Sequence, residues 1–305
     1  MKLSEFKTYS ITLPNGTLFS IDHPQVMGIV NVTEDSFYAG SRVVESDEIA
    51  DRVRLMLSDG VDVIDVGACS TRPDASLTEL CDEMIRLRAA LPIIRGVIAE
   101  STSRILLSVD TFRADVAKMA VEEFGVDIIN DISAGRLDAR MWPVVRELRV
   151  PYVLMHSRGT PDVMRQMTDY TTEGGVMAAV IEDLARNTDC LRQAGVNDVI
   201  IDPGFGFAKT VEQNYELLLD LELLHTIEAP ILVGLSRKSM IYKQLRLTPD
   251  DVLPATIALN TIALEKGAHF LRVHDVEAAR QAVAMIENLR STTSVAQPIT
   301  TFRNN

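Results

Sequence analysis

Eight short apolar runs recur along the chain, and polar residues and then sequence of helical periodicity follow each one. The runs are rich in Val and Ile, which is typical of strands that a parallel sheet buries on both faces. They are Val26–Val30, Val61–Val66, Leu106–Val109, Asp127–Ile129, Tyr152–Met155, Val199–Ile201, Ile231–Leu235 and His269–Val273. Glycines precede four of the runs, where a preceding helix would end in a left-handed residue. We therefore expect eight buried strands that alternate with helices.

This alternation predicts an α/β fold, a single (β/α)8 TIM barrel. The length of 305 residues fits one barrel of about 250 residues with extensions. An open, doubly wound sheet is the alternative. The opening segment turns at Asn15-Gly16, which predicts an N-terminal β-hairpin that could cap the bottom of the barrel. We expect three parts: the hairpin extension over 1–25, the barrel over 26–290 and a polar tail over 291–305.

Composition excludes several classes of protein. The chain has 30 basic and 43 acidic residues, and a net charge of -13 argues against a nucleic-acid binder, which needs a basic surface. Three cysteines, an odd number without a C-x-x-C pair, indicate a reducing compartment. The N-terminus has no apolar signal-peptide core, and apolar runs of roughly 18 residues are absent. We expect a cytoplasmic protein that does not associate with membranes.

Polar residues follow nearly every predicted strand. Because active sites of (β/α)8 barrels lie at the carboxyl ends of the strands, these residues would gather on one rim. One polar strand end is usually a cap or a turn, but eight buried together without partners would cost too much free energy. They are Asn31, Ser70–Pro73, Asp110, Asn130 with Asp131, the segment from Met155, Asp202, Gly234–Ser239, and Arg272 with His274. The rim is therefore predicted to bind a ligand.

One part of the rim suits a flat heterocycle. Asp110, Asn130 and Asp202 supply carboxylates and an amide, which can pair with several ring N–H donors. Asn31 offers a neutral oxygen to a hard cation such as Mg²⁺. These residue types predict a heterocycle pocket with a nearby Mg²⁺ contact.

Another part suits phosphate or diphosphate. Arg72, Lys238 and Arg272 are cationic, and His274 can become so. A few convergent cations can bind an anion even on an acidic protein. A diphosphate pocket beside the heterocycle pocket is the prediction.

The same residues have ordinary structural interpretations, which the sequence leaves open. Asp110 could cap the following helix with Thr111, and Asn130 with Asp131 could form a turn. Lys238 could be a solvated surface lysine.

Other polar positions are weaker candidates. Asp35 could equally cap a loop or contact Mg²⁺ or diphosphate. His156 and Arg158 are expected to be structural. Cys69 has no evident base beside it in sequence, so it is read as a small strand-end residue. The segment Gly204–Thr210 lacks the glycines of a nucleotide-binding loop.

Eight motifs, in this order, resemble those of the bacterial dihydropteroate synthases, a family of pterin-binding barrels. They are "MGIVNVTEDSF", "DVIDVGACSTRP", "SVDT", "DIINDISAG", "MHSRGTP", "DPGFGFAKT", "VGLSRKS" and "RVHDV". The resemblance covers about Val26 to Asn288. It implies a transferase of folate biosynthesis, which joins 6-hydroxymethyl-7,8-dihydropterin diphosphate to 4-aminobenzoate and yields 7,8-dihydropteroate and diphosphate. It also implies Mg²⁺ as cofactor, a homodimer and sensitivity to sulfonamides as a class.

The resemblance further implies roles for the matching residues. The pterin would contact Asp110, Asn130, Asp202, Lys238, Met155, Phe207 and Arg272. The diphosphate would contact Asn31, Arg72, Arg272 and His274, and Asn31 would also bind the metal, Mg²⁺. The 4-aminobenzoate would contact Phe37, Thr71, Pro73, Phe207, Lys238 and Ser239. The catalytic set would be Lys238, Asp110, Asp202, Arg272 and Asp35.

The chain departs from the family pattern at loop positions, namely Glu34, Cys69, Asp74, Ser157 and Ala208. These departures put loop conformation and 4-aminobenzoate affinity in question more than the reaction. Two rival functions stay open from sequence. One is a methyltetrahydrofolate–corrinoid methyltransferase, which would need no diphosphate pocket. The other is a catalytically inactive barrel that serves as a binding or regulatory subunit.

Overall fold

A computed structural model describes residues 6–32, 42–69, 78–160 and 163–292. The regular structure of these residues consists of ten strands, nine α-helices and the 3-10 helices Met164–Gln166, Thr171–Glu173 and Leu221–Ile227. The strands are β1 (Tyr9–Thr12), β2 (Leu18–Ile21), β3 (Gln25–Asn31), β4 (Val63–Gly67), β5 (Leu106–Asp110), β6 (Ile128–Asp131), β7 (Tyr152–Met155), β8 (Val199–Asp202), β9 (Leu232–Val233) and β10 (Phe270–Val273). The helices are α1 (Arg42–Ser58), α2 (Leu80–Ile98), α3 (Ala114–Phe124), α4 (Met141–Leu148), α5 (Val176–Gln193), α6 (Val211–Leu219), α7 (Ser239–Leu245), α8 (Leu253–Glu265) and α9 (Val276–Ser291).

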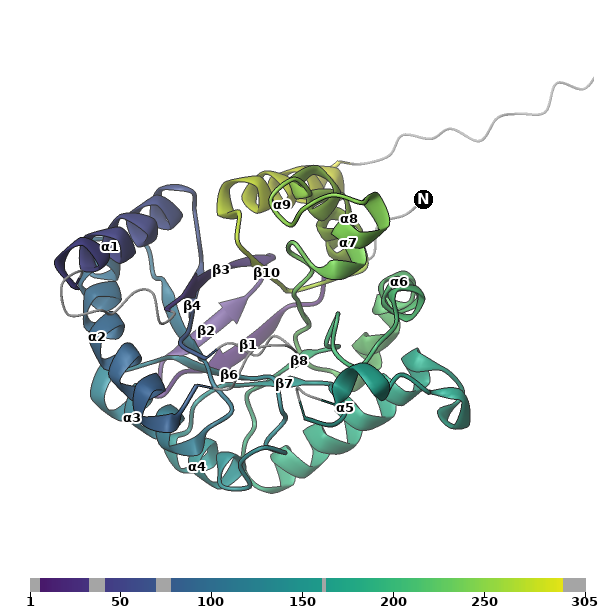
Figure 1. Cartoon of the computed structure of the whole chain (residues 1–305), viewed down its shortest axis with the longest axis horizontal. Coiled ribbons are helices and arrows are strands. Elements are labelled where there is room, and N and C mark those ends of the chain that lie inside the picture. Colours follow the sequence, from purple (N-terminus) through teal and green to yellow (C-terminus); the bar gives the residue numbers. More distant parts are fainter. Residues whose placement is uncertain (1–5, 33–41, 70–77, 161–162, 293–305) are drawn as a thin grey trace, which may run out of the picture.

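The strands β3 to β10 form one parallel sheet that closes on itself. Its order is β8-β7-β6-β5-β4-β3-β10-β9, and a parallel bridge between Ile201 and Ile231 joins the two ends. Figure 1 looks along the barrel, with the helices in a ring around the strands. The predicted single (β/α)8 barrel is therefore confirmed, and the open-sheet alternative is wrong.

Two apolar layers hold the barrel together. Outward-facing strand residues such as Ile64, Val109 and Leu154 pack beneath the helices. The interior of the barrel floor is a second cluster, to which each of the eight strands contributes one buried residue: Met27, Val63, Leu106, Ile128, Val153, Ile200, Leu232 and Phe270. Burial of this apolar surface supplies the main favourable free energy of folding.

The predicted N-terminal hairpin is present as β1 and β2, which pair antiparallel from Tyr9 opposite Ile21 to Thr12 opposite Leu18. Ile11, Leu13 and Ile21 from this segment are buried against the floor cluster. The hairpin thus covers the amino-terminal end of the barrel, and the opposite rim is left for the strand ends that carry polar residues. The division into three parts, with its tail over 291–305, stays a prediction.

Strand bounds differ from the predicted runs where tertiary contacts override the apolar pattern. Val61 is not in β4, because its N–H donates to Met56 O at the end of α1. The seventh strand shrinks to Leu232–Val233, since the Ile231 N–H donates to the His269 side chain at 3.0 Å instead of to a strand carbonyl. The fourth strand of the barrel, β6, extends to Asp131, so the alternative interpretation of Asn130 and Asp131 as a turn is wrong.

Within the part of the chain that the structure describes, each helix is too short or too polar to cross a membrane.

Candidate active site

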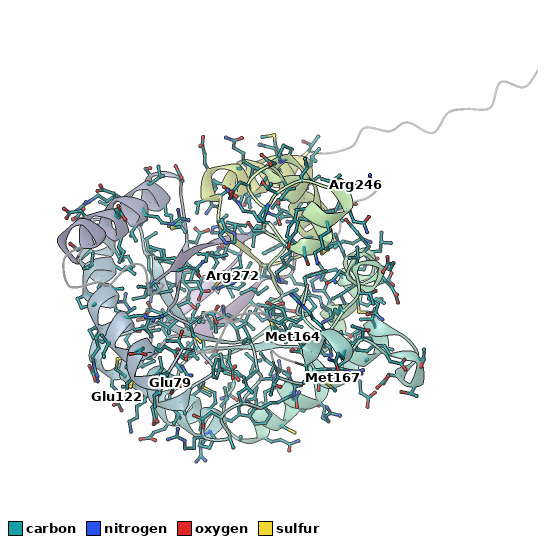
Figure 2. The ribbon with its side chains drawn as sticks, viewed as in Figure 1. Glu79, Glu122, Met164, Met167, Arg246 and Arg272 are labelled. Atoms are coloured by element: carbon teal, nitrogen blue, oxygen red, sulfur yellow. The ribbon has the colours of Figure 1, made fainter. Side chains whose placement is uncertain are left out.

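The rim of the barrel is built by the two-residue period of its strands. Two residues beyond the apolar floor, the inward-facing positions become Ile29, Asp65, Ser108, Asn130, Met155, Asp202, Gly234 and Arg272. Two residues further along their strands, Asn31, Gly67 and Asp110 also face the interior of the barrel. The interior therefore changes from apolar to polar along its axis, and Figure 2 places Arg272 among the side chains at the centre of the ring.

Arg272 on β10 joins two carboxylates from neighbouring strands. Its Nε donates to Asp65 Oδ2 at 2.6 Å, and its Nη2 donates to Asp110 Oδ2 at 2.7 Å. Asp65 also accepts hydrogen bonds from Ser108 Oγ at 2.6 Å and from Asn130 Nδ2 at 3.1 Å. This network fixes Arg272, Asp110 and Asn130 in one geometry.

The network also sets the charges of its members. Burial disfavours the charge of Arg272, but the carboxylates of Asp65 and Asp110 outweigh burial and raise its pKa. Burial raises the pKa of Asp110 to about 7, against the opposing charge of Arg272. Asp110 thus accepts from Arg272, and helix α3 begins after Arg113 without a side-chain cap. The interpretation of Asp110 as a helix cap is wrong.

Lys238 and Asp202 form a second polar group across the barrel. Lys238 Nζ donates to the backbone oxygen of Phe205 and lies 5.0 Å from the centre of the Phe207 ring. Burial lowers the pKa of Lys238 to about 8. Burial also raises the pKa of Asp202, while the nearby charge of Lys238 opposes that rise. Lys238 is not a solvated surface lysine.

An apolar wall lies beside these polar groups. Phe112, Ile132 and Met155 form a separate buried cluster, and the partly buried Phe207 packs against it. Met155 ends β7, whereas Phe207 lies in the loop after β8, so the fold brings together two residues that the sequence analysis assigned to one pocket. A flat apolar wall next to carboxylates and an ammonium group is able to bind a polar heterocycle.

Asn31 and His274 lie at strand ends on the same rim. The Asn31 side chain is exposed. A Cβ atom added to Gly67 would lie 3.6 Å from Asn31 Oδ1 and 3.6 Å from Asp110 Cβ, so these two side chains flank Gly67. His274 Nδ1 lies 2.9 Å from Ser236 Oγ, which also accepts the His274 backbone N–H at 3.2 Å. Burial lowers the pKa of His274 to about 4. The residue is neutral at pH 7, so it offers an N–H donor and not the positive charge that the sequence allowed.

Five predicted site residues lie outside the described residues, namely Asp35, Phe37, Thr71, Arg72 and Pro73. Arg86 on α2 contacts described residues on both sides of the segment 70–77, which follows β4. Its Nη1 donates to Ala68 O at 3.1 Å and to Thr78 Oγ1 at 3.4 Å. Ser239 is described, and it begins α7 directly after Lys238.

Two residues that the sequence analysis did not single out belong to this region. Asp65 is fully buried in the middle of β4, where a charged residue interrupts an apolar run. Lys209 is buried beyond β8, and its Nζ lies 3.0 Å from His156 Nδ1. A carboxylate on the inward face of a strand was a usable signal for Asp65. No sequence signal pointed to Lys209.

Ala208, one of the departures from the family pattern, has a positive φ of 48°. This left-handed conformation favours glycine over alanine.

A family of proteins described as pterin binding enzyme matches residues 27–274 of the chain. The chain belongs to this family. A dihydropteroate synthase of Streptococcus pyogenes serotype M6 is 37% identical over 268 residues, which is 87% of this chain and 95% of that protein. The mitochondrial folate synthesis bifunctional protein of Arabidopsis thaliana is 39% identical over 282 residues, and the match spans 87% of this chain but only 50% of that protein.

A solved structure of the pterin-binding family has the same fold. The Yersinia pestis dihydropteroate synthase in complex with a sulfonamide drug superposes with a TM-score of 0.82 at 33% identity, over 93% of this chain and all of that one. The resemblance to bacterial dihydropteroate synthases that the eight motifs predicted is confirmed.

Proposed function

We propose that this chain joins 6-hydroxymethyl-7,8-dihydropterin diphosphate to 4-aminobenzoate and releases 7,8-dihydropteroate and diphosphate, the dihydropteroate synthase reaction of folate biosynthesis. The observation that carries the proposal is the inward-facing ring of Asp65, Asp110, Asn130, Asp202 and Arg272, which are already linked or clustered on one rim. This ring lies in a chain of the pterin-binding family whose bacterial relatives are named for that reaction.

The pterin ring would lie between the apolar wall and the polar network. Asp202 and Asp110 would accept hydrogen bonds from ring N–H groups, and Asn130, held by Asp65, would add an oriented amide. Met155 and Phe207 would contact the ring faces, and Arg272 could also stack on the ring. Lys238, in the segment between β9 and α7, would hydrogen-bond the ring beside Phe207.

The diphosphate would lie at the strand ends nearest β3 and β10. Arg272 would supply positive charge, His274 an N–H donor and Asn31 an oxygen ligand. Arg72, which follows β4 in the sequence, would add a second positive charge. Mg²⁺ fits this donor set, because Asn31 is an exposed neutral oxygen and Mg²⁺ usually keeps several waters and takes other ligands from substrate phosphates. When bound, Mg²⁺ would supply charge neutralisation for the diphosphate.

The charges of the rim suit cleavage of the carbon–oxygen bond to diphosphate. Cleavage leaves negative charge on the diphosphate, which the guanidinium of Arg272 would stabilise, and positive charge on the pterin methylene. Asp110 and Asp202, in their ionised forms, would stabilise that positive charge. The weakly nucleophilic amine of 4-aminobenzoate then needs to be positioned more than deprotonated. No covalent intermediate with the protein is required.

The 4-aminobenzoate would lie above the pterin, against Phe207, Lys238 and Ser239. Phe37, Thr71 and Pro73, and the catalytic contribution of Asp35, are proposed from the motifs alone. A homodimer and a cytoplasmic location also stay predictions.

The test is diphosphate release by the purified protein, supplied with 6-hydroxymethyl-7,8-dihydropterin diphosphate and Mg²⁺, with and without 4-aminobenzoate. Release that accompanies dihydropteroate formation supports the proposal. Tight pterin binding without release would favour the methyltransferase or the inactive barrel.

A further inference from the structure

Lys209 lies beyond the end of β8, yet its side chain returns to the barrel and is buried there. Its Nζ contacts three groups: His156 Nδ1 at 3.0 Å, Gly204 O at 2.9 Å and Phe207 O at 3.1 Å. An ammonium group has three N–H donors, so all three are used when His156 Nδ1 accepts. A buried lysine with this complete set of partners is held in one place.

The pair formed by Lys209 and His156 keeps its contacts in either charge state. Burial lowers the pKa of Lys209 to about 7 and that of His156 well below its usual value. As an ammonium, Lys209 donates to His156 Nδ1. As a neutral amine, it keeps both hydrogen bonds to the carbonyl oxygens, and its lone pair accepts a hydrogen bond from the Nδ1–H of the other tautomer of His156.

The segment that Lys209 holds carries part of the proposed pterin pocket. Phe205 O accepts the hydrogen bond from Lys238, and the Phe207 ring lies beneath the Lys238 ammonium. Gly206, between them, has a φ of +79°, and a Cβ there would lie 3.3 Å from the Lys238 Cδ atom. The position of Lys238 therefore depends on the backbone of this segment.

His156 joins the same segment to β7 through its backbone. Its N–H donates to Asp202 O at 2.9 Å, and a Cβ on Gly204 would collide with its carbonyl oxygen. Lys209 adds the side-chain link between these two strand ends.

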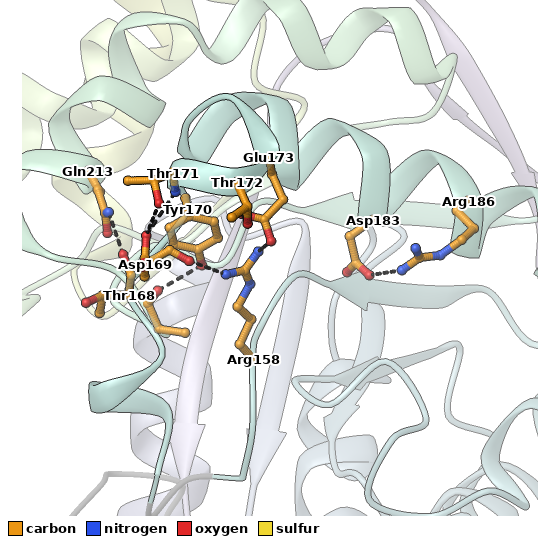
Figure 3. Close-up of polar contacts among 11 residues, drawn as sticks. Arg158, Thr168, Asp169, Tyr170, Thr171, Thr172, Glu173, Asp183, Arg186 and Gln213 are labelled. Carbon is orange, nitrogen blue, oxygen red and sulfur yellow. Dashed lines mark hydrogen bonds and ion pairs between the residues drawn. The ribbon is translucent and has the colours of Figure 1, made fainter.

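The outer side of the loop is held separately. Asn214 on α6 accepts the Gly206 N–H at 2.7 Å, and the Tyr170 hydroxyl donates to Ala208 O at 2.8 Å. Arg158 stacks on the Tyr170 ring and pairs with Glu173 at 2.9 Å (Figure 3). These contacts fix the loop from outside, whereas Lys209 holds the carbonyl groups that face the barrel.

We propose that Lys209, through its bonds to His156, Gly204 and Phe207, is a positioning residue that places Phe207 and Lys238 for the pterin. The inference rests on the proposed function, since it assigns Lys209 to the pterin pocket of that reaction. Lys209 does not contact the reacting atoms in this assignment.

The test compares the wild type with Lys209→Met, which keeps the length of the side chain but removes its three donors. Calorimetry with 6-hydroxymethyl-7,8-dihydropterin diphosphate and Mg²⁺ measures affinity. Hydrogen exchange measures the backbone amides of residues 204–208 against those of β7. We expect at least about tenfold weaker binding, at least about tenfold faster exchange in 204–208 and unchanged exchange in β7. In steady state, the KM for the pterin should rise more than kcat falls.

Two controls separate positioning from general destabilisation. Val283→Ala removes buried apolar volume on α9, remote from the loop, and should lower the melting temperature without changing pterin affinity. Lys118→Met removes an exposed lysine on α3 and should change neither. If Lys209→Met does not fold, Lys209→Gln serves in its place, with smaller losses expected because its amide can still donate to the two carbonyl groups.

Unchanged affinity and unchanged exchange in the Met variant would overturn the inference. The same loss of affinity in Val283→Ala would also overturn it. A wild-type protein that does not bind the pterin would contradict the proposed function instead, and the exchange data alone would then decide whether Lys209 holds the loop.

Discussion

The carboxylate of Asp65 on β4 accepts a hydrogen bond from Arg272 on β10 at 2.6 Å. The contact lies inside the barrel, and the Asp65 side chain is fully buried. Loss of one partner from a buried ion pair leaves the other charge uncompensated. The same contact holds the guanidinium where the diphosphate and the pterin are proposed to bind. Asp65 therefore links fold stability to function.

We predict that Asp65→Asn lowers the free energy of unfolding by about 3 kcal/mol, near the lower limit for a broken buried pair because Asp110 still binds Arg272. The kcat/KM for the pterin substrate should fall at least about tenfold. Urea denaturation and steady-state kinetics measure the two effects. Asp51→Asn, the same change at an exposed position on α1, is the matched control. Wild-type values for both quantities would show that Asp65 is dispensable.

Lys238→Ala should lower kcat/KM at least about tenfold, which corresponds to about 1.4 kcal/mol of transition-state stabilisation. The reason is the position of the ammonium group, between Phe205 O and the Phe207 ring, at the junction of both proposed substrate sites. Lys243→Ala, at an exposed lysine on the following helix α7, should have wild-type kinetics. Activity of Lys238→Ala within twofold of wild type would remove Lys238 from the proposed site.

Asp202→Asn should weaken pterin binding and leave the fold intact. An asparagine oxygen can still accept the Gly204 N–H, which Asp202 Oδ1 accepts at 2.7 Å, so the loop geometry should persist. The amide cannot replace the carboxylate toward two ring N–H donors. Calorimetry with the pterin diphosphate and a thermal melt test the two statements. Asp189→Asn on the exposed face of α5 is the control, and equal affinities would show that Asp202 is not the pterin anchor.

The order of the strands and the polar rim could be predicted because both depend on local pattern. Apolar runs locate strands, and parallel strands in a barrel place their carboxyl ends on one side. Asp110, Asn130 and Asp202 followed from this rule. Asp65 was missed because only strand ends were considered, although Val63, Asp65 and Gly67 share one face by the two-residue period.

Other features depend on tertiary contacts that the sequence does not encode locally. Lys209 returns to the barrel because Gly204, Gly206 and Ala208 all adopt positive φ, and this combination reverses the loop. The neutral state of His274 follows mainly from its burial, which only the folded chain provides, and the positive charge of Arg272 also opposes protonation. The sequence therefore could not predict the orientation of the Lys209 side chain or the protonation state of His274.

Sulfonamides should inhibit dihydropteroate formation in competition with 4-aminobenzoate, because the proposed 4-aminobenzoate site would accept an aromatic amine with an acidic group. The related Yersinia pestis enzyme is known in complex with such a drug. Initial rates measured over a range of 4-aminobenzoate concentrations should extrapolate to the same kcat at each concentration of sulfanilamide. Inhibition that excess 4-aminobenzoate does not relieve would place the drug elsewhere.

His269, at the floor of the barrel, should make the protein less stable in acid. Its neutral ring accepts the Ile231 N–H at 3.0 Å and contacts Lys7 O at 3.0 Å through Nε2. Burial lowers its pKa to about 3, and His225, Lys7 and Arg290 oppose protonation from the neighbouring elements. In the unfolded chain the pKa is about 6.5. Between these values the unfolded state binds more protons, so stability is full above pH 6.5 and falls as the pH decreases toward 3.

At pH 5 the contribution of His269 to this loss is about 2 kcal/mol, from about 1.4 kcal/mol for each pH unit below 6.5. Urea denaturation at pH 7 and pH 5 measures the decline. His269→Gln has no titratable ring, so its decline should be smaller than that of the wild type by about this amount, although its stability at pH 7 is reduced. An equal decline in wild type and His269→Gln would show that His269 is not the acid-sensitive group.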